Sequence, residues 1–412
     1  MHTSPATQPG SGDAGGMNVV EWATAAALAD LGHSVELITR RADPSDPDAV
    51  EVRPGVVLRH LTAGPEAPLA KSEIDAFIPE FSEALGRLGP YDLVHSHHWM
   101  SGVAALPHAR AWGVPHVQSY HSVAALPGSP LAEGEAAESP ARVPGERLVA
   151  EQSQAVVAIS AAEARTVIER CGADPERVCI VPPGVDHDLF RPLLPGEARW
   201  ILEPAAGIPR RGDGSGLPPV SAPLANGFAL FAARLHPLKD PDLAIRAMAE
   251  VDLAIRPHLV IAGDVSADFA SYEAKLLALV DELGLAGQVS FIGPQPRAEL
   301  ARLMRSARLV LVPSHSETFG LVALEAASSG TAVIAAAAGG LREAVAHGET
   351  GQLMDSRRPI DWANAITYLL TEPGLLERQG LVARVHARRF AWLWSAERLV
   401  AIYAELLEKG TP

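Results

Sequence analysis

Short apolar runs alternate with amphipathic segments along most of the chain. Residues 17–31 carry apolar side chains at helical spacing and end at Gly32, a residue type that often terminates helices. Apolar runs rich in β-branched residues predict strands at 34–39, 56–61, 91–96, 114–120, 155–160 and 177–181. Further helices are predicted at 72–88, 146–153 and 161–170. Continuous apolar strands separated by helices are typical of a parallel sheet covered on both faces.

Residues 191–224 interrupt this alternation with a segment rich in Pro, Gly and Ser, which predicts a linker or a surface insertion. Beyond it, strands are predicted at 227–233, 258–263, 288–293, 308–313 and 331–336, and helices at 242–251, 272–283, 297–307, 321–329, 341–347 and 361–407. We therefore expect an α/β protein with two Rossmann-like domains, at 1–190 and 225–385, that face each other across a cleft. Residues 386–412 are expected to form a C-terminal helix that packs back on the N-terminal domain.

Composition and charge narrow the class of partner. The 412 residues include 34 Lys and Arg against 49 Asp and Glu, for a net charge of −15. Such a charge disfavours nucleic acid or an anionic membrane as the main partner. No apolar run is long enough to span a bilayer, and the N-terminal residues do not resemble a secretion signal, so we expect a soluble, cytoplasmic protein. Cys171 and Cys179 form no CxxC pair, which excludes a disulfide framework and a sulfur-type zinc site.

Gly10, Gly12 and Gly15 match the G-x-G-x-x-G fingerprint of dinucleotide-binding proteins. That fingerprint requires a buried strand directly before it, whereas MHTSPATQP holds two prolines and no apolar run. A nicotinamide-dependent dehydrogenase is therefore disfavoured. The segment is better interpreted as a loop that leads into the helix at Met17 and whose amides face an anion or a sugar hydroxyl, with an ordinary turn as the alternative.

Arg234 and Lys239 follow a predicted strand and precede a helix that begins with the N-cap residue Asp240 and with Pro241. Two cations beside a helix N-terminus favour a diphosphate site. Gly339 and Gly340, before the helix at 341–347, would let backbone approach a phosphate, although a plain turn is an equal alternative.

Glu317 and Glu325 cannot both reach one small group on a single continuous helix. If residues 316–320 form a loop and the helix begins near Leu321, the two carboxylates can bind different parts of an extended ligand, such as the sugar and the ribose of a nucleotide sugar. His121 lies just past a strand, where a structural role and a catalytic role are both open. A metal at His95, His97 and His98 is not expected, because His98 would project to the opposite side of a continuing strand.

Together these motifs resemble the family-4 retaining glycosyltransferases of GT-B fold: Glu317-x7-Glu325 with Phe319 and Gly320, the Arg234/Lys239 pair, and the glycine turn. The resemblance implies donor-binding roles for Gln8, Pro9, Gly16, Arg234, Lys239, Glu317, Phe319, Gly320, Leu321 and Glu325. It implies acceptor-binding roles for His2, Asp13, Asn18, Lys71, His98, Ser122 and Arg142. His121 would lie beside the reacting sugar, and with Glu317, Arg234 and Lys239 it would form the catalytic set.

The opening HTSPATQPGSGDAGGMN is most similar to a branch of that family in mycothiol biosynthesis, which implies UDP-N-acetylglucosamine as donor and 1D-myo-inositol 3-phosphate as acceptor. The resemblance implies no cofactor and no essential Mg²⁺; a homodimer stays open. His98 stands where the branch has a Tyr, and Ser122 where it has a Thr. These differences leave open an antibiotic-pathway paralogue with another acceptor, such as the thiol of ergothioneine, and a GDP-sugar donor. A sugar-nucleotide epimerase and a non-catalytic nucleotide-sugar sensor are further alternatives.

The family resemblance also implies a short apolar strand ahead of the position of His2. The sequence begins without it. Either translation begins upstream, or a central strand is missing and the edges of its neighbours are exposed.

Overall fold

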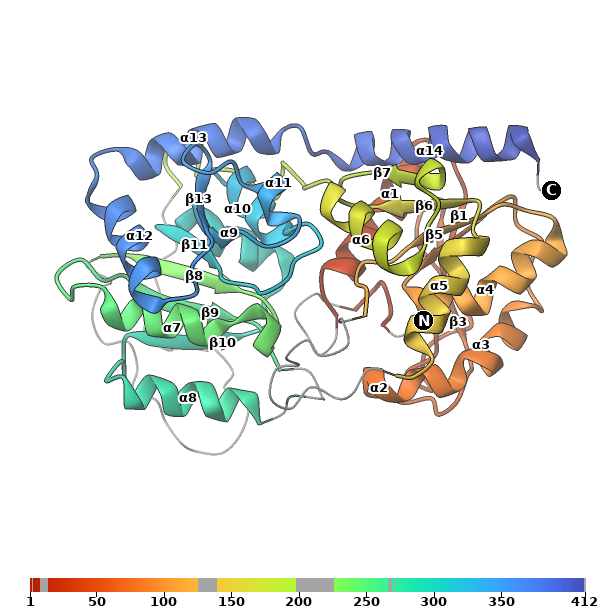
Figure 1. The fold of residues 1–412 in the computed structure, drawn as a ribbon, viewed down its shortest axis with the longest axis horizontal. Coiled ribbons are helices and arrows are strands. Elements are labelled where there is room, and N and C mark those ends of the chain that lie inside the picture. Colours follow the sequence, from red (N-terminus) through yellow and green to blue (C-terminus); the bar gives the residue numbers. More distant parts are fainter. Residues whose placement is uncertain are drawn as a thin grey trace. The chain divides into compact units, whose positions relative to one another are not determined.

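The computed structural model describes residues 1, 3–7, 14–124, 139–197, 226–265, 269 and 271–410. The chain divides into two units (Figure 1). Unit 1 comprises Met1–Thr7, Gly16–Gly184 and Phe390–Pro412, and unit 2 comprises Gln8–Gly15 and Val185–Arg389. The predicted linker lies largely outside the described residues, as do His2, Gln8, Pro9 and Asp13. Among the described helices, none combines the length and the apolar character needed to cross a bilayer.

Unit 1 contains two separate sheets. Their strands are β1 (Val35–Arg40), β2 (Ala49–Arg53), β3 (Val56–Leu61), β4 (Val94–His97), β5 (His116–Ser119), β6 (Ala155–Ala158) and β7 (Val178–Ile180). One sheet has the order β1-β3-β2, with β2 antiparallel to β3, and the other is the parallel sheet β4-β5-β6-β7. Strands β1 and β4 each stand at the end of a sheet, and among the described residues no strand joins them.

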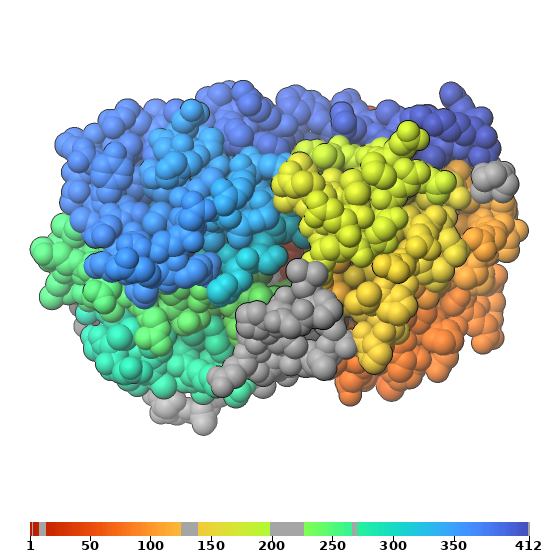
Figure 2. All heavy atoms as spheres, in the orientation of Figure 1, coloured from red at the N-terminus to blue at the C-terminus, as the bar shows by residue number. Residues whose placement is uncertain are grey.

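The helices of unit 1 are α1 (Gly16–Asp30), α2 (Lys71–Ile74), α3 (Ile78–Leu85), α4 (Trp99–Trp112), α5 (Arg142–Gln152), α6 (Ala161–Cys171) and α14 (Trp392–Lys409). The C-terminal helix α14 packs on α1 through Ala27, Leu28 and Ala396. Helices α5 and α6 contact each other and form much of one face of unit 1, in yellow in Figure 2. The sheets of unit 1 are therefore covered by helices from both ends of the chain.

Three elements of unit 1 differ from the predictions, and one of them is strand β2, which was not predicted. The helix predicted at 72–88 is interrupted by a 3-10 turn, Asp75–Phe77, between α2 and α3. Helix α4 was not predicted, because its apolar residues lack a single face: Trp99, Met100, Ala104 and Ala105 are all buried.

Unit 2 contains one six-stranded sheet. Its strands are β8 (Phe228–Ala232), β9 (His258–Ala262), β10 (Val289–Gly293), β11 (Leu309–Val312), β12 (Ala332–Ala336) and β13 (Gly351–Met354), all parallel, in the order β10-β9-β8-β11-β12-β13. The first five were predicted. Strand β13 was missed because the short run GQLM has only one buried residue.

The helices of unit 2 are α7 (Pro241–Glu250), α8 (Tyr272–Glu282), α9 (Arg297–Ser306), α10 (Leu321–Ser328), α11 (Leu341–Ala344), α12 (Pro359–Thr371) and α13 (Leu375–Ala387). The stretch predicted as helical at 361–407 is thus three helices, α12, α13 and α14. A core that includes Phe231, Ile261, Leu311 and Trp362 joins the sheet to its helices. Both units are Rossmann-like α/β bodies, as the sequence predicted.

Candidate active site

The strand order of unit 2 reverses between β8 and β11. The chain runs outward from β8 through β9 to β10, then returns to β11 on the other side of β8. Ligands of open α/β sheets bind outside the carboxyl ends of strands at such a switch point. The loops after β8 and β11 are those that carry Arg234, Lys239 and Glu317.

The loop after β8 is held in a defined shape. Residues 237–239 form a 3-10 turn, and Asp240, at φ 54°, caps α7 by accepting a hydrogen bond from the backbone of Leu243. Pro241 occupies the first helical position, as predicted. Lys239 is thereby placed just before the N-terminus of α7, where an anion is favoured.

Lys239 and Glu317 lie in contact. The distance from Lys239 Nζ to Glu317 Oε1 is 2.6 Å, and Ser314 donates a hydrogen bond to the same oxygen at 2.8 Å. Both side chains of the ion pair remain about one-fifth exposed. Residues 316–320 form no helix, and α10 begins at Leu321, so Glu317 precedes the helix as expected.

Glu325, on α10, lies in a more buried environment than Glu317 does. Its side chain is only 3% exposed and pairs with Arg297, the first residue of α9. Burial raises the pKa of Glu325 above its usual value, while Arg297 acts to lower it. The Arg297 guanidinium also lies 4.6 Å from the ring centroid of Phe190. Sequence reasoning missed Arg297, because nothing in the local pattern links two residues on different helices.

Replacing Arg297 with alanine is expected to destabilise the protein by about 3 kcal/mol at neutral pH, the lower end for breaking a buried pair, because Arg297 is itself partly exposed. The folded protein already binds a proton at Glu325 more tightly than the unfolded chain does, so this group makes stability fall as pH rises above about 4.5. The stability of the Arg297→Ala variant should fall more steeply with rising pH than that of wild type. Melting temperatures from pH 5 to 8 test this.

Arg302→Ala serves as the control, because Arg302 lies on the same helix and its partner Glu299 is exposed. A second variant, Arg297→Ala with Glu325→Gln, should lose the extra pH dependence. Identical pH slopes for Arg297→Ala and wild type would contradict the assignment.

The glycine turn packs directly against the loop that carries Glu317. Gly340 donates a backbone hydrogen bond to the Glu317 carbonyl at 2.9 Å. A Cβ on Gly340 would lie 2.3 Å from the carbonyl oxygen of Thr318, and one on Gly339 would lie 2.1 Å from that of Glu317. The two glycines thus allow the approach that sets the position of Glu317.

Gly340→Ala is therefore expected to push back the backbone at Thr318 and Phe319. We expect a loss of about 3 kcal/mol, since the obstacle is backbone and cannot rotate away. Gly348→Ala is the comparison: its added Cβ meets nothing within 4 Å but the residue has φ +79°, so its loss reports backbone strain without crowding. Thermal unfolding of both variants tests this; a Gly340→Ala protein as stable as wild type would show that crowding at Gly340 is unimportant.

Two further residues that sequence reasoning missed fix the loop after β8. Asp240 forms an ion pair with Arg357, and its carboxylate lies 3.2 Å from Nε2 of His315. The backbone of His315 donates to the carbonyl of Leu238 at 2.8 Å. The loops after β8 and β11 are thus joined by several contacts in addition to the Lys239–Glu317 pair.

The remaining donor-side predictions lie near helix starts. Phe319 is buried, Gly320 has φ 104° and precedes α10, and Leu321 is its first residue. Gly16 is the first residue of α1 in unit 1. Arg234 lies two residues past the end of β8, and a Cβ on Gly15 would lie 3.6 Å from its Nε.

In unit 1, His98 and His121 follow the ends of β4 and β5. Among the described non-glycine residues, these two and Asp240 have positive φ, at 71°, 58° and 54°. His98 is buried and its backbone donates to Ser119 at 2.8 Å. Such strained positions concentrate at functional sites. Burial lowers the pKa of His121 to about 4, so the ring is neutral at physiological pH.

Arg142 lies in a buried ion pair on α5. Its Nε is 2.9 Å from Glu146 Oε1, and the two side chains are 7% and 3% exposed. Its Nη2 donates to Ser122 at 3.2 Å. The structure therefore brings together two predicted acceptor residues, Arg142 and Ser122. Asn18 is also buried, and its amide donates to the Ser4 carbonyl at 2.7 Å.

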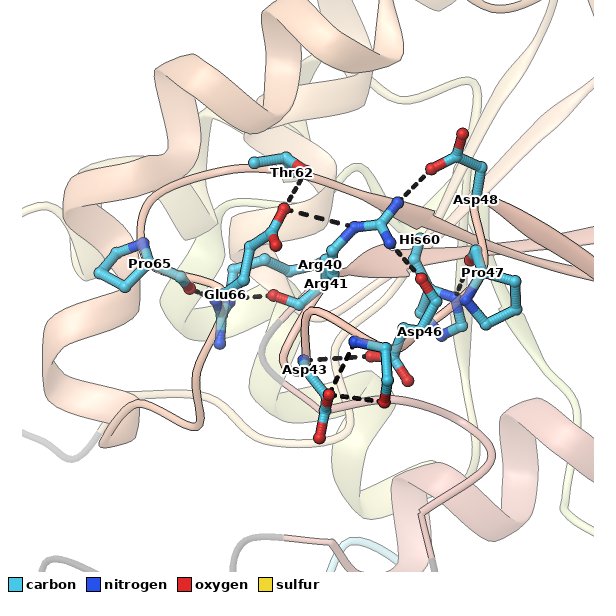
Figure 3. A network of polar contacts seen from close by, with 11 residues as sticks. Arg40, Arg41, Asp43, Asp46, Pro47, Asp48, His60, Thr62, Pro65 and Glu66 are labelled. Atoms are coloured by element: carbon cyan, nitrogen blue, oxygen red, sulfur yellow. Dashed lines mark hydrogen bonds and ion pairs between the residues drawn. The ribbon is translucent and has the colours of Figure 1, made fainter.

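Lys71 is the first residue of α2. The segment before it is tied to the end of β1, because Arg40 donates to the carbonyl of Pro65 at 2.6 Å (Figure 3). Arg40 also donates to the carbonyl of Ala67 at 2.7 Å. Arg41 in turn pairs with Asp48 and Glu66.

Within the described residues, no group of three or more His, Cys, Asp or Glu side chains is placed to hold a metal ion.

Comparison with known families gives two matches that together span most of the chain. The model described as "Glycosyl transferase 4-like domain" matches residues 15–184, and "Glycosyl transferases group 1" matches residues 220–385. Two Rossmann-like α/β units that match these two models define a glycosyltransferase of the GT-B class. The chain belongs to the GT4 family of glycosyltransferases.

Curated relatives match almost the whole chain. The D-inositol 3-phosphate glycosyltransferase of Thermobispora bispora is 42% identical over 99% of this chain and 94% of its own length. The enzyme of that name from Stackebrandtia nassauensis is 39% identical over 99% of this chain and 91% of its own length.

Solved structures agree on the fold. Sucrose-phosphate synthase from Thermosynechococcus elongatus has a TM-score of 0.84 and 27% identity, covering 99% of this chain and 98% of its own. The catalytic domain of starch synthase IV from Arabidopsis thaliana, bound to ADP and acarbose, has a TM-score of 0.70 and 15% identity over 96% of each chain, a likeness of fold alone.

Proposed function

We propose that the protein transfers N-acetylglucosamine from UDP-N-acetylglucosamine to 1D-myo-inositol 3-phosphate with retention of configuration. The observation that carries this proposal is the similarity, at about 40% identity over nearly the full chain, to relatives named D-inositol 3-phosphate glycosyltransferase. The donor-side motifs and the basic residues of unit 1 supply the chemistry.

On the donor side, cleavage of the sugar–phosphate bond leaves negative charge on the departing diphosphate. Lys239 and Arg234, with the N-terminus of α7, would stabilise that charge. Glu317, held by Lys239 and Ser314, would accept hydrogen bonds from sugar hydroxyls, and Glu325 would accept them from the ribose. Retention is expected with the leaving phosphate assisting deprotonation of the acceptor.

On the acceptor side, Lys71, Ser122 and Arg142 would hold the phosphate. The geometry of Arg142 supports this role, because its Nε is held by Glu146 and its Nη2 donates to Ser122, a second residue of the proposed phosphate site. His121 would lie beside the reacting sugar. On the donor side, Arg234 and Lys239 would supply the positive charge that a divalent metal could otherwise supply to the diphosphate, so we expect EDTA to leave turnover unchanged.

A second acceptor class is favoured by one residue. His98 stands where the mycothiol branch has a Tyr that donates to the acceptor phosphate, and its imidazole is buried. This difference supports a paralogue that glycosylates another small acceptor, such as the thiol of ergothioneine, from a UDP- or GDP-sugar.

A mass-spectrometric screen tests these proposals: UDP- and GDP-sugars against inositol 3-phosphate, inositol and ergothioneine, with and without EDTA. N-acetylglucosaminyl-inositol phosphate as the main product supports the first proposal, and a thioglycoside supports the second. An isomerised nucleotide sugar without acceptor would identify an epimerase. Binding of UDP by calorimetry without turnover would identify a sensor.

A further inference from the structure

His121 has a backbone conformation that must be supported by its neighbours. At φ 58° it lies in the left-handed region, which is uncommon for a residue with a Cβ. Such a conformation is strained and persists only where surrounding contacts hold it. The contacts of its imidazole therefore indicate what fixes the ring.

The ring of His121 is hydrogen-bonded to that of His97, the last residue of β4. His97 Nδ1 and His121 Nε2 are 2.7 Å apart. The two ring planes differ by only 16°, while the ring centroids are 5.0 Å apart. A nitrogen–nitrogen distance so much shorter than the centroid separation means that the rings meet edge to edge, in one plane.

His97 is itself held by a second imidazole. His95 stacks on it, with centroids 4.5 Å apart and planes 24° apart. His95 is fixed at both nitrogens, by the hydroxyl of Tyr403 at 2.6 Å and by that of Ser119 at 3.0 Å. The support for His121 thus extends from β4 to β5 and to the C-terminal helix α14, all within unit 1.

We propose that His97 is a positioning residue that fixes the orientation and the tautomer of the His121 ring through this edge-to-edge hydrogen bond. The inference rests on the proposed function, in which His121 lies beside the reacting sugar. It goes beyond that function by assigning a role to a histidine that the sequence motifs left unused.

The tautomer of His121 depends on the direction of its hydrogen bond with His97, because both rings are neutral. Burial lowers the pKa of His97 well below its usual value and that of His121 to about 4, so both rings are neutral at pH 7. One ring must then donate and the other accept. When His97 carries its proton on Nδ1, His121 carries its own on Nδ1; the opposite arrangement places the proton of His121 on Nε2.

Variants at His97 separate positioning from simple space filling. His97→Ala is expected to lower kcat on the order of 10²-fold, as misplacement of a reacting group does, with little change in the KM of the donor. The amide of Asn reaches the place of Nδ1, whereas that of Gln reaches the place of Nε2. His97→Asn should therefore restore most of kcat and His97→Gln should not.

His116→Ala is the matched control. His116 is a buried histidine of β5, hydrogen-bonded to Ser96 and Ser153 at 2.9 Å each and not to His121. It should lower the melting temperature without lowering kcat in the remaining folded protein. If His97→Ala behaves like His116→Ala, or if Gln serves as well as Asn, the proposal is overturned.

A readout independent of turnover comes from ¹⁵N NMR of the His121 ring. Wild type and His97→Asn should show one fixed tautomer, and His97→Ala an averaged signal. An unchanged His121 signal in His97→Ala would refute the positioning role. If wild type transfers sugar to no acceptor tested, the proposed function fails, while the NMR result still decides the role of His97.

Discussion

Lys239→Ala is expected to lower kcat/KM by about 10²–10³-fold, as the loss of one group that stabilises transition-state charge commonly does. Lys239 lies at the switch point of the unit 2 sheet, just before the N-terminus of α7. Its ammonium also holds Glu317 at 2.6 Å, so the variant removes a positive charge and releases a carboxylate that would contact the sugar. Steady-state kinetics with varied donor measure the loss.

The fold should survive this change, because both side chains of the pair are partly exposed and such pairs contribute little to stability. Arg234→Ala should behave similarly if the two cations share the diphosphate. Lys275→Ala, on the exposed face of α8, is the control and should retain full activity. Wild-type turnover in Lys239→Ala would refute the diphosphate assignment.

Arg142→Ala should produce a large loss of a different kind. Removing the guanidinium leaves the carboxylate of Glu146, only 3% exposed, without its cationic partner, and breaking a buried pair costs about 3–5 kcal/mol. The variant should melt at a lower temperature. Protein that remains folded should show a raised KM for a phosphorylated acceptor and an unchanged KM for the donor.

The double variant Arg142→Ala with Glu146→Gln separates the two effects. The neutral Gln can still accept the hydrogen bond that Ala124 now donates to Glu146 at 2.9 Å. Stability should largely return, while acceptor KM should stay high. A double variant with normal acceptor KM would show that Arg142 acts only on the fold. With a phosphate-free acceptor, wild type and the Arg142→Ala variant should show the same acceptor KM.

The fold could be predicted because its signals are local. Buried strands such as Phe228–Ala232 are short apolar runs bounded by turn residues, and α7 begins at the cap and proline that the sequence indicates. Placing Glu317 ahead of α10 required only the observation that one helix could not direct both carboxylates to one ligand. The GT4 family was recognisable for the same reason: its motifs are contiguous.

The supports of the site could not be predicted, because each joins residues that are distant in sequence. Arg297 reaches Glu325 from another helix, and Arg357 reaches Asp240 from beyond β13. His97 lies in the histidine-rich run HSHH. From that run, we predicted only that no metal is bound there. Its contact with His121 depends on the pairing of β4 with β5, which no local pattern specifies.

The division of the chain has a consequence for building chimaeras of GT4 enzymes. Unit 1 includes residues from 390 onward as well as Met1–Thr7 and Gly16–Gly184, with α14 packed on α1. Exchanging the first half of the gene alone would pair each foreign α1 with the host's α14, and Tyr403, which holds His95, would come from the wrong parent. A working hybrid must therefore transplant the two ends of the reading frame together and leave the middle in place.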